Sequence, residues 1–199
     1  ILLKKNKNKI TGIFDYDYKN SQVMFKHLNV RNPVLDGKLN GVVEFLPYFN
    51  FNLNLDLNGL NLTKLHNFLT KLDDSKKKNL FRINEKINGQ LNLTANKLYS
   101  KYDLIDSLES QFLFRNGNIL VEKVLLNLGK LGAADINGII KNDKYSNFKF
   151  ENNIFIDNQK YFYRKFGIYN KNDLPTNLFI SGSLDLEKLN MRFFEISNQ

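Results

Sequence analysis

The sequence predicts a mainly β fold, organised as an antiparallel meander with a few short helices inserted. Three observations lead to this prediction. Apolar and polar residues alternate strictly over 48–59 (YFNFNLNLDLNG), similar alternation returns along most of the chain, and no long helical pattern separates these runs. Because successive side chains of a strand point to opposite faces, each run indicates a strand with one apolar face. A doubly wound α/β fold would instead require strands that alternate with long helices.

The strand predicted over 48–59 cannot be stable alone. Its apolar side consists of Phe49, Phe51, Leu53, Leu55 and Leu57, and its other side is mostly Asn. Burying five such side chains gains roughly 7–15 kcal/mol at about 1.5–3 kcal/mol each. Ordering the backbone of ten residues costs a similar amount, at about 1–2 kcal/mol per residue. Neighbouring strands must therefore extend the sheet, and something must cover its apolar side.

Further strands follow in order, with recognisable turns between them. Asn116-Gly117 is a strong two-residue hairpin signal, since both positions must take positive φ. A β-bulge is predicted at Glu122-Lys123, where the alternation slips by one residue, and a turn at Asn142-Asp143. The alternating runs that predict these strands are Phe14–Tyr18, Leu39–Phe45, Ile87–Leu93, Leu108–Phe114, Ile119–Leu128, Ile136–Ile140, Phe148–Ile156 and Leu178–Leu186.

Short helices are predicted at three places. Residues 62–72 carry apolar side chains three and four apart, the spacing of an amphipathic helix, and we expect Asp73 and the following lysines to end it in a loop. Gln159–Phe166 is the second predicted helix, and Leu186–Phe194 the third. The apolar residues that define the first helix are Leu62, Leu65, Phe68, Leu69 and Leu72.

Length and charge restrict the class of protein. The chain has 199 residues, which we interpret as a single β-rich domain over 1–199, and it begins with Ile1, so we expect a fragment of a longer protein. Its formal net charge is +9. The lysines are scattered and no nucleic-acid-binding motif accompanies them, so no nucleic-acid partner is expected. A basic surface that faces anionic lipid head groups is a better interpretation of this charge.

The sequence lacks the residue patterns of enzymes and metal sites. It has no Cys and only two His, His27 and His66, without a zinc-ligand spacing. No nucleophile elbow occurs, and Gly129-Lys130-Leu131-Gly132 lacks the end of a phosphate-binding loop, so we read it as a turn or sheet bend. We therefore predict a protein that is not an enzyme, with no catalytic residues, no metal and no cofactor.

Three stretches of the second half resemble the AsmA-like family of bacterial envelope proteins, the lipid-transport proteins of the AsmA, TamB and YhdP type. They are INGQLNLTANKL (87–98), ESQFLFRNGNILVEKVLLNLGKLGAADINGII (109–140) and ISGSLDLEKLN (180–190). The shared pattern is a Gly-x-Leu-x-Leu strand, a polar stretch, a strand that ends in Asn-Gly and a return strand that leads to a Gly-rich one. The resemblance is to the C-terminal type of region and is clearest over residues 80–195.

This resemblance implies both a shape and a function. Proteins of this family carry a long, curled antiparallel sheet that forms an open groove or flattened half-barrel, and larger members are proposed to conduct phospholipid towards the outer membrane. The chain would then be a periplasmic module of a parent protein anchored in the inner membrane, in contact with lipid acyl chains and with neighbouring segments of its own chain. The expected groove residues are Phe49, Phe51, Leu53, Leu55, Leu57, Phe112, Phe114, Ile119, Val121, Phe148, Phe150, Ile154, Ile156, Leu178 and Ile180.

The residues leave a second interpretation open. The same apolar side chains could fill a closed core beneath the small helices, since buried apolar residues are usually core. The chain would then be a structural or interaction domain without a lipid site. The two interpretations differ in whether an apolar strip larger than a few hundred square ångströms is left exposed.

Overall fold

The fold is mainly β and mostly antiparallel, as the alternating pattern predicts, and its strands form one large open sheet. The computed structural model describes residues 2–5, 8–142, 147–167 and 177–198. Within these ranges thirteen strands belong to a single sheet. They are β1 (Leu2–Lys5), β2 (Asn8–Asp17), β3 (Gln22–Arg31), β4 (Leu35–Glu44), β5 (Phe49–Asn61), β6 (Ile87–Ala95), β7 (Leu98–Tyr99), β8 (Ser107–Arg115), β9 (Asn118–Asn127), β10 (Gly132–Ile140), β11 (Asn147–Ile156), β12 (Asn177–Asp185) and β13 (Asn190–Asn198).

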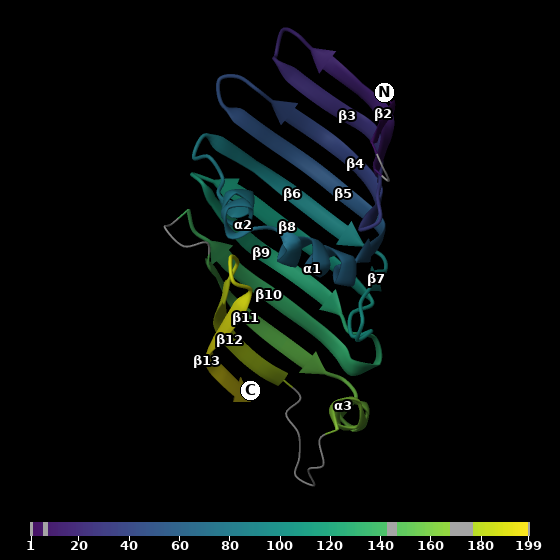
Figure 1. Ribbon diagram of the computed structural model, residues 1–199, viewed down its shortest axis with the longest axis vertical. Coiled ribbons are helices and arrows are strands. Elements are labelled where there is room, and N and C mark those ends of the chain that lie inside the picture. Colours follow the sequence, from purple (N-terminus) through teal and green to yellow (C-terminus); the bar gives the residue numbers. More distant parts are fainter. Residues whose placement is uncertain (1, 6–7, 143–146, 168–176, 199) are drawn as a thin grey trace.

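The strands follow one another in space almost in the order of the sequence. The path runs β1-β2-β3-β4-β5-β6-β8-β9-β10-β11-β12-β13, and β7 pairs with β5 beside it. Neighbouring strands are antiparallel, except that β5 runs parallel to β6 and to β7. The sheet does not close on itself. Figure 1 shows the N-terminal strands at one end of the molecule and β12 and β13 towards the other.

The parallel pair β5–β6 requires a crossover connection, which two helices provide. Parallel neighbours cannot be joined by a tight turn. Helix α1 (Leu62–Lys71) and helix α2 (Asp74–Phe81) fill the connection, and Figure 1 shows both in front of the middle strands. Two further short elements are the 3-10 turn η1 (Gly129–Leu131), between β9 and β10, and helix α3 (Gln159–Phe166), after β11.

The register places all the predicted groove residues on one side of the sheet. Leu53 lies opposite Gly41 and Leu91, and Phe112 lies opposite Leu91 and Val121. The same row continues through Gly138 to Phe150 and Gly182. Because facing residues share a face, we call this side of the sheet the apolar face and the opposite side the outer face. The remaining predicted groove residues lie an even number of positions from these along their own strands.

The predicted hairpin and bulge are both confirmed. Asn116 and Gly117 form the turn between β8 and β9, with φ of 51° and 77°. In β9, Val121 pairs with Phe112 and Lys123 with Gln111, so Glu122 is the extra residue of a bulge. The bulge keeps Val121 and Val124 on the same face although they are three positions apart. The Asp143 half of the predicted turn at Asn142-Asp143 lies outside the described residues.

The helix predicted over Leu186–Phe194 is wrong. Residues 186–189 form a turn, and β13 follows from Asn190. The Asp185 carboxylate accepts hydrogen bonds from the backbone N–H groups of Glu187 and Lys188, at 2.9 and 3.0 Å. Leu189 then takes a positive φ of 56° and Asn190 pairs with Asp185, so this segment closes a hairpin instead of continuing as a helix. A bulge at Phe194 then interrupts the two-residue alternation of the strand. Together, the turn and the bulge gave the apolar residues a helix-like spacing.

The other two predicted helices are confirmed as α1 and α3, but the loop after α1 is wrong. Lys76 and Lys77 belong to α2, because Asp73 caps the N-terminus of this helix. Its carboxylate accepts a hydrogen bond from the Lys76 backbone N–H at 2.8 Å. Asp is a preferred N-cap residue, so the sequence DDSKKK begins a helix rather than ending one.

The buried core cluster is small and lies on the middle strands, at the carboxyl ends of β5 and β6. Leu57, Leu60, Ala95 and Leu98 form it where β5, β6 and β7 meet, and Leu62 at the start of α1 packs against it. The chain exposes 13459 Å² of surface. A compact monomer of this mass would expose about 9,700 Å². The molecule is therefore an extended sheet with a local core rather than a closed globule.

We predict that Gly132→Ala destabilises the sheet by about 2–3 kcal/mol. Gly132 begins β10 with φ of +133°, and a Cβ there would overlap the Phe155 carbonyl oxygen. Urea denaturation followed by circular dichroism measures the change. Gly59→Ala is the matched control, since its Cβ would meet only the end of the Tyr99 ring at 3.0 Å. Equal denaturation midpoints for the two variants would contradict the prediction.

Candidate functional site

The apolar face is the candidate site, because it crosses the whole sheet and is covered only in part. In its middle, Ile119 and Val121 of β9 are buried. Towards the C-terminal end of the sheet, Phe193 and Ile196 of β13 are 55% and 62% exposed. At the other end, Phe14 of β2 is 39% exposed. Both flanks of the apolar face are therefore open to solvent.

Phenylalanine rings lie against glycines on this face. A Cβ on Gly89 would lie 2.6 Å from the ring of Phe51, and a Cβ on Gly182 would lie 2.9 Å from the ring of Phe150. Neither ring could keep its position beside a larger residue. These glycines let bulky aromatic rings lie close to the backbone, as in aromatic rescue of strand glycines.

Aromatic contacts connect strands across the face. The ring centroids of Phe51 on β5 and Phe114 on β8 lie 5.1 Å apart, although β6 runs between the two strands. Phe148 and Phe150 are neighbours along β11, with their centroids 5.7 Å apart. Such tilted pairs add about 0.5–1.5 kcal/mol each beyond the area that they bury. Two pairs of the predicted groove residues thus contact one another in the folded sheet.

The outer face is polar over β4, β5 and β6. The Asn54 side chain donates to Asn40 at 3.0 Å and accepts from Asn92 at 2.8 Å, so side-chain amides connect β4, β5 and β6. Thr94 donates to Asp56 at 2.9 Å in the same region. Amide rows of this kind stabilise neighbouring strands without burying apolar area. Further along the sheet the outer face is apolar in places, because Leu113, Leu120 and Ile139 face one another across β8, β9 and β10. Ile13 and Phe155 are also exposed on this face.

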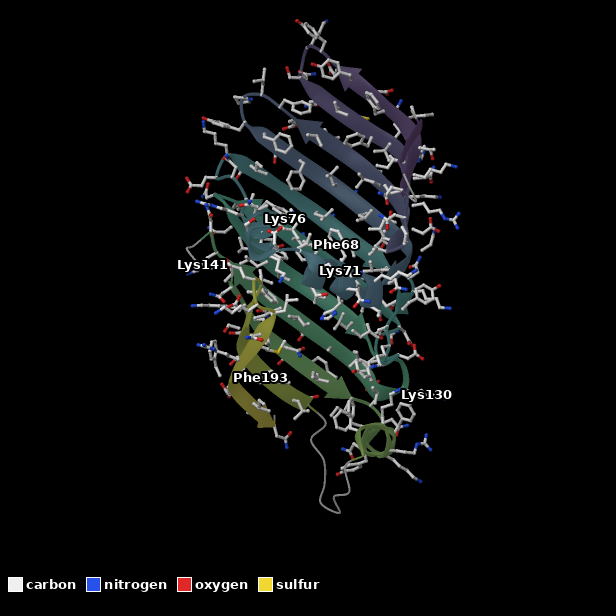
Figure 2. All side chains as sticks on the ribbon, viewed as in Figure 1. Phe68, Lys71, Lys76, Lys130, Lys141 and Phe193 are labelled. Carbon is white, nitrogen blue, oxygen red and sulfur yellow. The ribbon has the colours of Figure 1, made fainter. Side chains whose placement is uncertain are left out.

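Helices α1 and α2 cover the middle of the apolar face. Leu62 belongs to the same packed cluster as Leu93 and Leu108, which lie on this face. Leu65, Leu69 and Leu72 are half-buried. Phe68, which the sequence pattern groups with them, is instead 53% exposed. Figure 2 shows Phe68 and Lys71 on α1 and Lys76 on α2, in front of the sheet.

The cap of α2 is an exposed ionic cluster. The Asp73 carboxylate accepts from the Lys76 backbone N–H and the Ser75 hydroxyl, each at 2.8 Å, and pairs with the Lys76 ammonium at 2.7 Å. The hydrogen bond with the Lys76 side chain is the largest cause that lowers the pKa of Asp73 far below its ordinary value. The same hydrogen bond raises the pKa of Lys76. The cap is therefore ionised at neutral pH.

The sequence pattern missed part of the apolar face. Phe14 belongs to it through its pairing with Phe25, as do Met191, Phe193 and Ile196 of β13. Alternation was visible around Phe14, but no pairing connected it with the face of 48–59. Met191 and Phe193 fall within the helix predicted over Leu186–Phe194, because the Phe194 bulge conceals the alternation of β13. Only the observed register reveals that these exposed side chains belong to the site.

Two polar side chains interrupt the apolar face. The buried Ser110 hydroxyl donates to the Leu93 carbonyl oxygen at 3.1 Å. Asn152 lies opposite Ile136 and Ile180, and its buried Oδ1 atom has no hydrogen-bond partner among the described residues. A buried acceptor without a partner costs about 1–3 kcal/mol. Asn152 is thus an unfavourable residue in a face that is otherwise apolar over its neighbouring strands.

The titratable residues do not converge on a site. Within the described ranges, no group of three or more His, Asp or Glu side chains could hold a metal ion. Asp15 pairs with Lys26 on the outer face, and the Gly129–Leu131 segment is the η1 turn that joins β9 to β10, as expected. No helix in the described part of the chain is both long and apolar enough to cross a membrane.

Comparison of the chain with protein-family models, curated proteins and solved structures finds no match. The resemblance to AsmA-like proteins therefore stays a prediction from the quoted motifs. Whether the apolar face contacts lipid also stays a prediction, although the predicted residues share one face. The function must accordingly be argued from the geometry of that face.

We predict that Asp73→Ala increases hydrogen exchange at the Lys76 and Lys77 amides several-fold, because it removes the N-cap acceptor. In the unsubstituted protein, Asp73 stabilises α2 fully at a pH above its unfolded pKa, about 3.9. This stabilisation is lost as the pH falls towards the lowered pKa of Asp73 in the folded protein. Protection of α2 should thus be constant from about pH 5 to neutrality. Glu109→Ala, at an exposed residue of β8, is the control. Unchanged exchange in Asp73→Ala would contradict the cap assignment.

Proposed function

We propose that this chain is a lipid-binding and lipid-conducting β-groove module of the bacterial envelope, which acts in the periplasm in phospholipid transport or outer-membrane biogenesis. The observation that carries the proposal is an apolar face that crosses a single sheet and is open at both flanks. The periplasmic location and the anchored parent chain come from the family resemblance alone. Under this proposal the protein is not an enzyme and needs no cofactor.

The dimensions of the face suit acyl chains. Twelve strands in sequence, at about 4.8 Å per pair, form a path of roughly 50 Å across the sheet. One leaflet of a bilayer has a hydrocarbon thickness of about 15 Å. The apolar face is therefore roughly three acyl chains long, which is more than one bound lipid requires. A surface of this length suits lipids that move along it, rather than a single enclosed ligand.

The open flanks count against the alternative of a closed core. A closed core needs a second layer over the whole apolar face. In the described part of the chain, α1 and α2 provide such a layer only over the middle strands. Exposed Phe14, Phe193 and Ile196 lie beyond this cover. Monomeric soluble proteins rarely expose contiguous apolar patches of more than a few hundred square ångströms, and larger ones mark interaction sites.

Native mass spectrometry with lipid extraction is the direct test of lipid binding. The segment would be purified from a bacterial host without detergent and its bound lipids identified. Stoichiometric phospholipid would support the proposal. A well-folded protein without lipid, which also takes up none from added phospholipid, would overturn it.

We predict that an Asp on the apolar face lowers phospholipid capture about threefold or more, because a carboxylate there would be desolvated by an acyl chain. The variants are Leu53→Asp, Phe150→Asp and Phe193→Asp. Phe193 is already 55% exposed, so its variant should fold even if the others do not. Capture is measured as lipid phosphorus per mole of protein after gel filtration.

Matched controls carry the same charge on the outer face. Asn52→Asp neighbours Leu53 on β5, and Phe155→Asp alters an exposed phenylalanine on the outer face of β11, the strand of Phe150. Phe194→Asp alters the exposed bulge residue beside Phe193. These control variants should capture as much phospholipid as the unsubstituted protein. Equal capture by the two sets of folded variants would show that the apolar face does not hold the lipid.

A further inference from the structure

Helix α3 and turn η1 form a basic and aromatic tip at one end of the sheet. The Asp157 backbone N–H donates to the Leu131 carbonyl oxygen at 3.0 Å, which joins the start of α3 to η1. Figure 1 shows α3 past the end of β11 at the lower end of the molecule, and Figure 2 shows Lys130 beside it. We call the residues of η1 and α3 the α3 tip.

The α3 tip is well defined although the helix has only eight residues. At its N-terminus the Asn158 side chain accepts a hydrogen bond from the Tyr161 backbone N–H at 2.8 Å. At its C-terminus Gly167 takes a left-handed conformation, with φ of 65°, and donates its N–H to the Tyr163 carbonyl oxygen. Buried Leu131 anchors the adjoining turn. Caps at both ends and this anchor fix the backbone of the tip.

The cations of the tip are exposed and have no anionic partner among the described residues. Lys130, Lys160, Arg164 and Lys165 are exposed, and none forms an ion pair in the described part of the chain. Arg164 lies over the ring of Tyr161, 5.4 Å from its centroid. Lys130, Lys160 and Arg164 line one hollow together with Tyr161. By contrast, Lys76 on α2 is neutralised by Asp73. The tip thus carries four cations without an ion-pair partner in the described ranges, beside the two nearby carboxylates of Asp106 and Asp157.

Apolar aromatic surface lies directly beside these charges. Phe166 is 48% exposed, and its ring centroid lies 4.7 Å from that of Phe162. Tyr and Phe next to Lys and Arg are typical of segments that insert at the boundary between head groups and acyl chains. A nucleic-acid duplex would be attracted by the same charge, but its bases are stacked on one another and would leave Phe166 in solvent; only a single strand could stack a base on it.

We propose that the α3 tip docks onto the surface of a lipid bilayer rich in anionic head groups. The head-group phosphates would contact the four cations, and Phe166 would enter the interface. The tip directly follows Ile154 and Ile156, which belong to the apolar face at the end of β11. Docking would therefore place one border of the apolar face at the head-group layer. This inference concerns bilayer contact, and its test is independent of lipid capture by the apolar face.

The experiment exploits the absence of Trp from the chain. Phe166→Trp places a single indole on the tip, and Phe68→Trp places one at an exposed Phe on α1 as a control. Each variant is titrated with vesicles of phosphatidylcholine containing about one third phosphatidylglycerol, and with pure phosphatidylcholine vesicles. We expect a blue shift and quenching by brominated lipid for the tip indole alone, only with anionic vesicles, and reduced by salt.

Charge reversal on the tip completes the test. The double substitution Arg164→Glu/Lys165→Glu, introduced beside Phe166→Trp, should weaken binding to anionic vesicles at least tenfold. Lys38→Glu/Lys149→Glu makes the same change in net charge on the exposed outer face and should leave binding within about twofold. Absence of vesicle binding, equal shifts for both indoles, or equal weakening by both charge reversals would overturn the proposal. Equally tight, tip-dependent binding of an oligonucleotide would overturn the assignment of a bilayer partner.

Discussion

The structure depends on one constraint: each strand must pair with its neighbours so that its apolar side chains lie on the same side of the sheet. A shift of one residue in any pair would move the apolar side chains of that strand to the outer face. The bulges at Glu122 and Phe194 lie where the sequence departs from strict alternation, and each restores the common face. The amide row through Asn40, Asn54 and Asn92 adds a second reason for the same register, from the other side.

A single sheet with one apolar face cannot bury that face by itself. The parallel pairing of β5 with β6 brings α1 and α2 onto the middle strands, where Leu62 packs against the core around Leu57 and Ala95. Beyond these helices, the side chains of β2 and β13 stay exposed. The crossover thus explains both the local core and the open flanks. What distinguishes this chain from a sandwich is that no second layer extends over those flanks in its described part.

The open face and the charged tip suggest different contacts with lipid. On the apolar face, acyl chains would pack against the row of Phe and Leu side chains. The glycines of this face let the Phe rings lie against the backbone. Phosphate is suited to exposed cations such as Lys160 and Arg164, which lack carboxylate partners in the described residues. The two surfaces meet at the end of β11. A lipid that left a bilayer at the tip would therefore reach apolar side chains within a few residues of the head-group layer.

The sequence by itself determined the mainly β fold, the Asn116-Gly117 hairpin, the Glu122 bulge, helices α1 and α3, and the composition of the apolar face in the long strands. Each of these depends on local periodicity or on backbone preferences that a few neighbouring residues express. The sequence did not reveal α2, since a capping Asp before lysines looks like a solvated loop, or β13, since a turn and a bulge imitate helical spacing. Only the tertiary structure decided that the sheet stays open, that Phe68 faces solvent, and that Phe14 and Phe193 join the apolar face. These properties depend on pairing and coverage between segments distant in sequence, which no local pattern encodes.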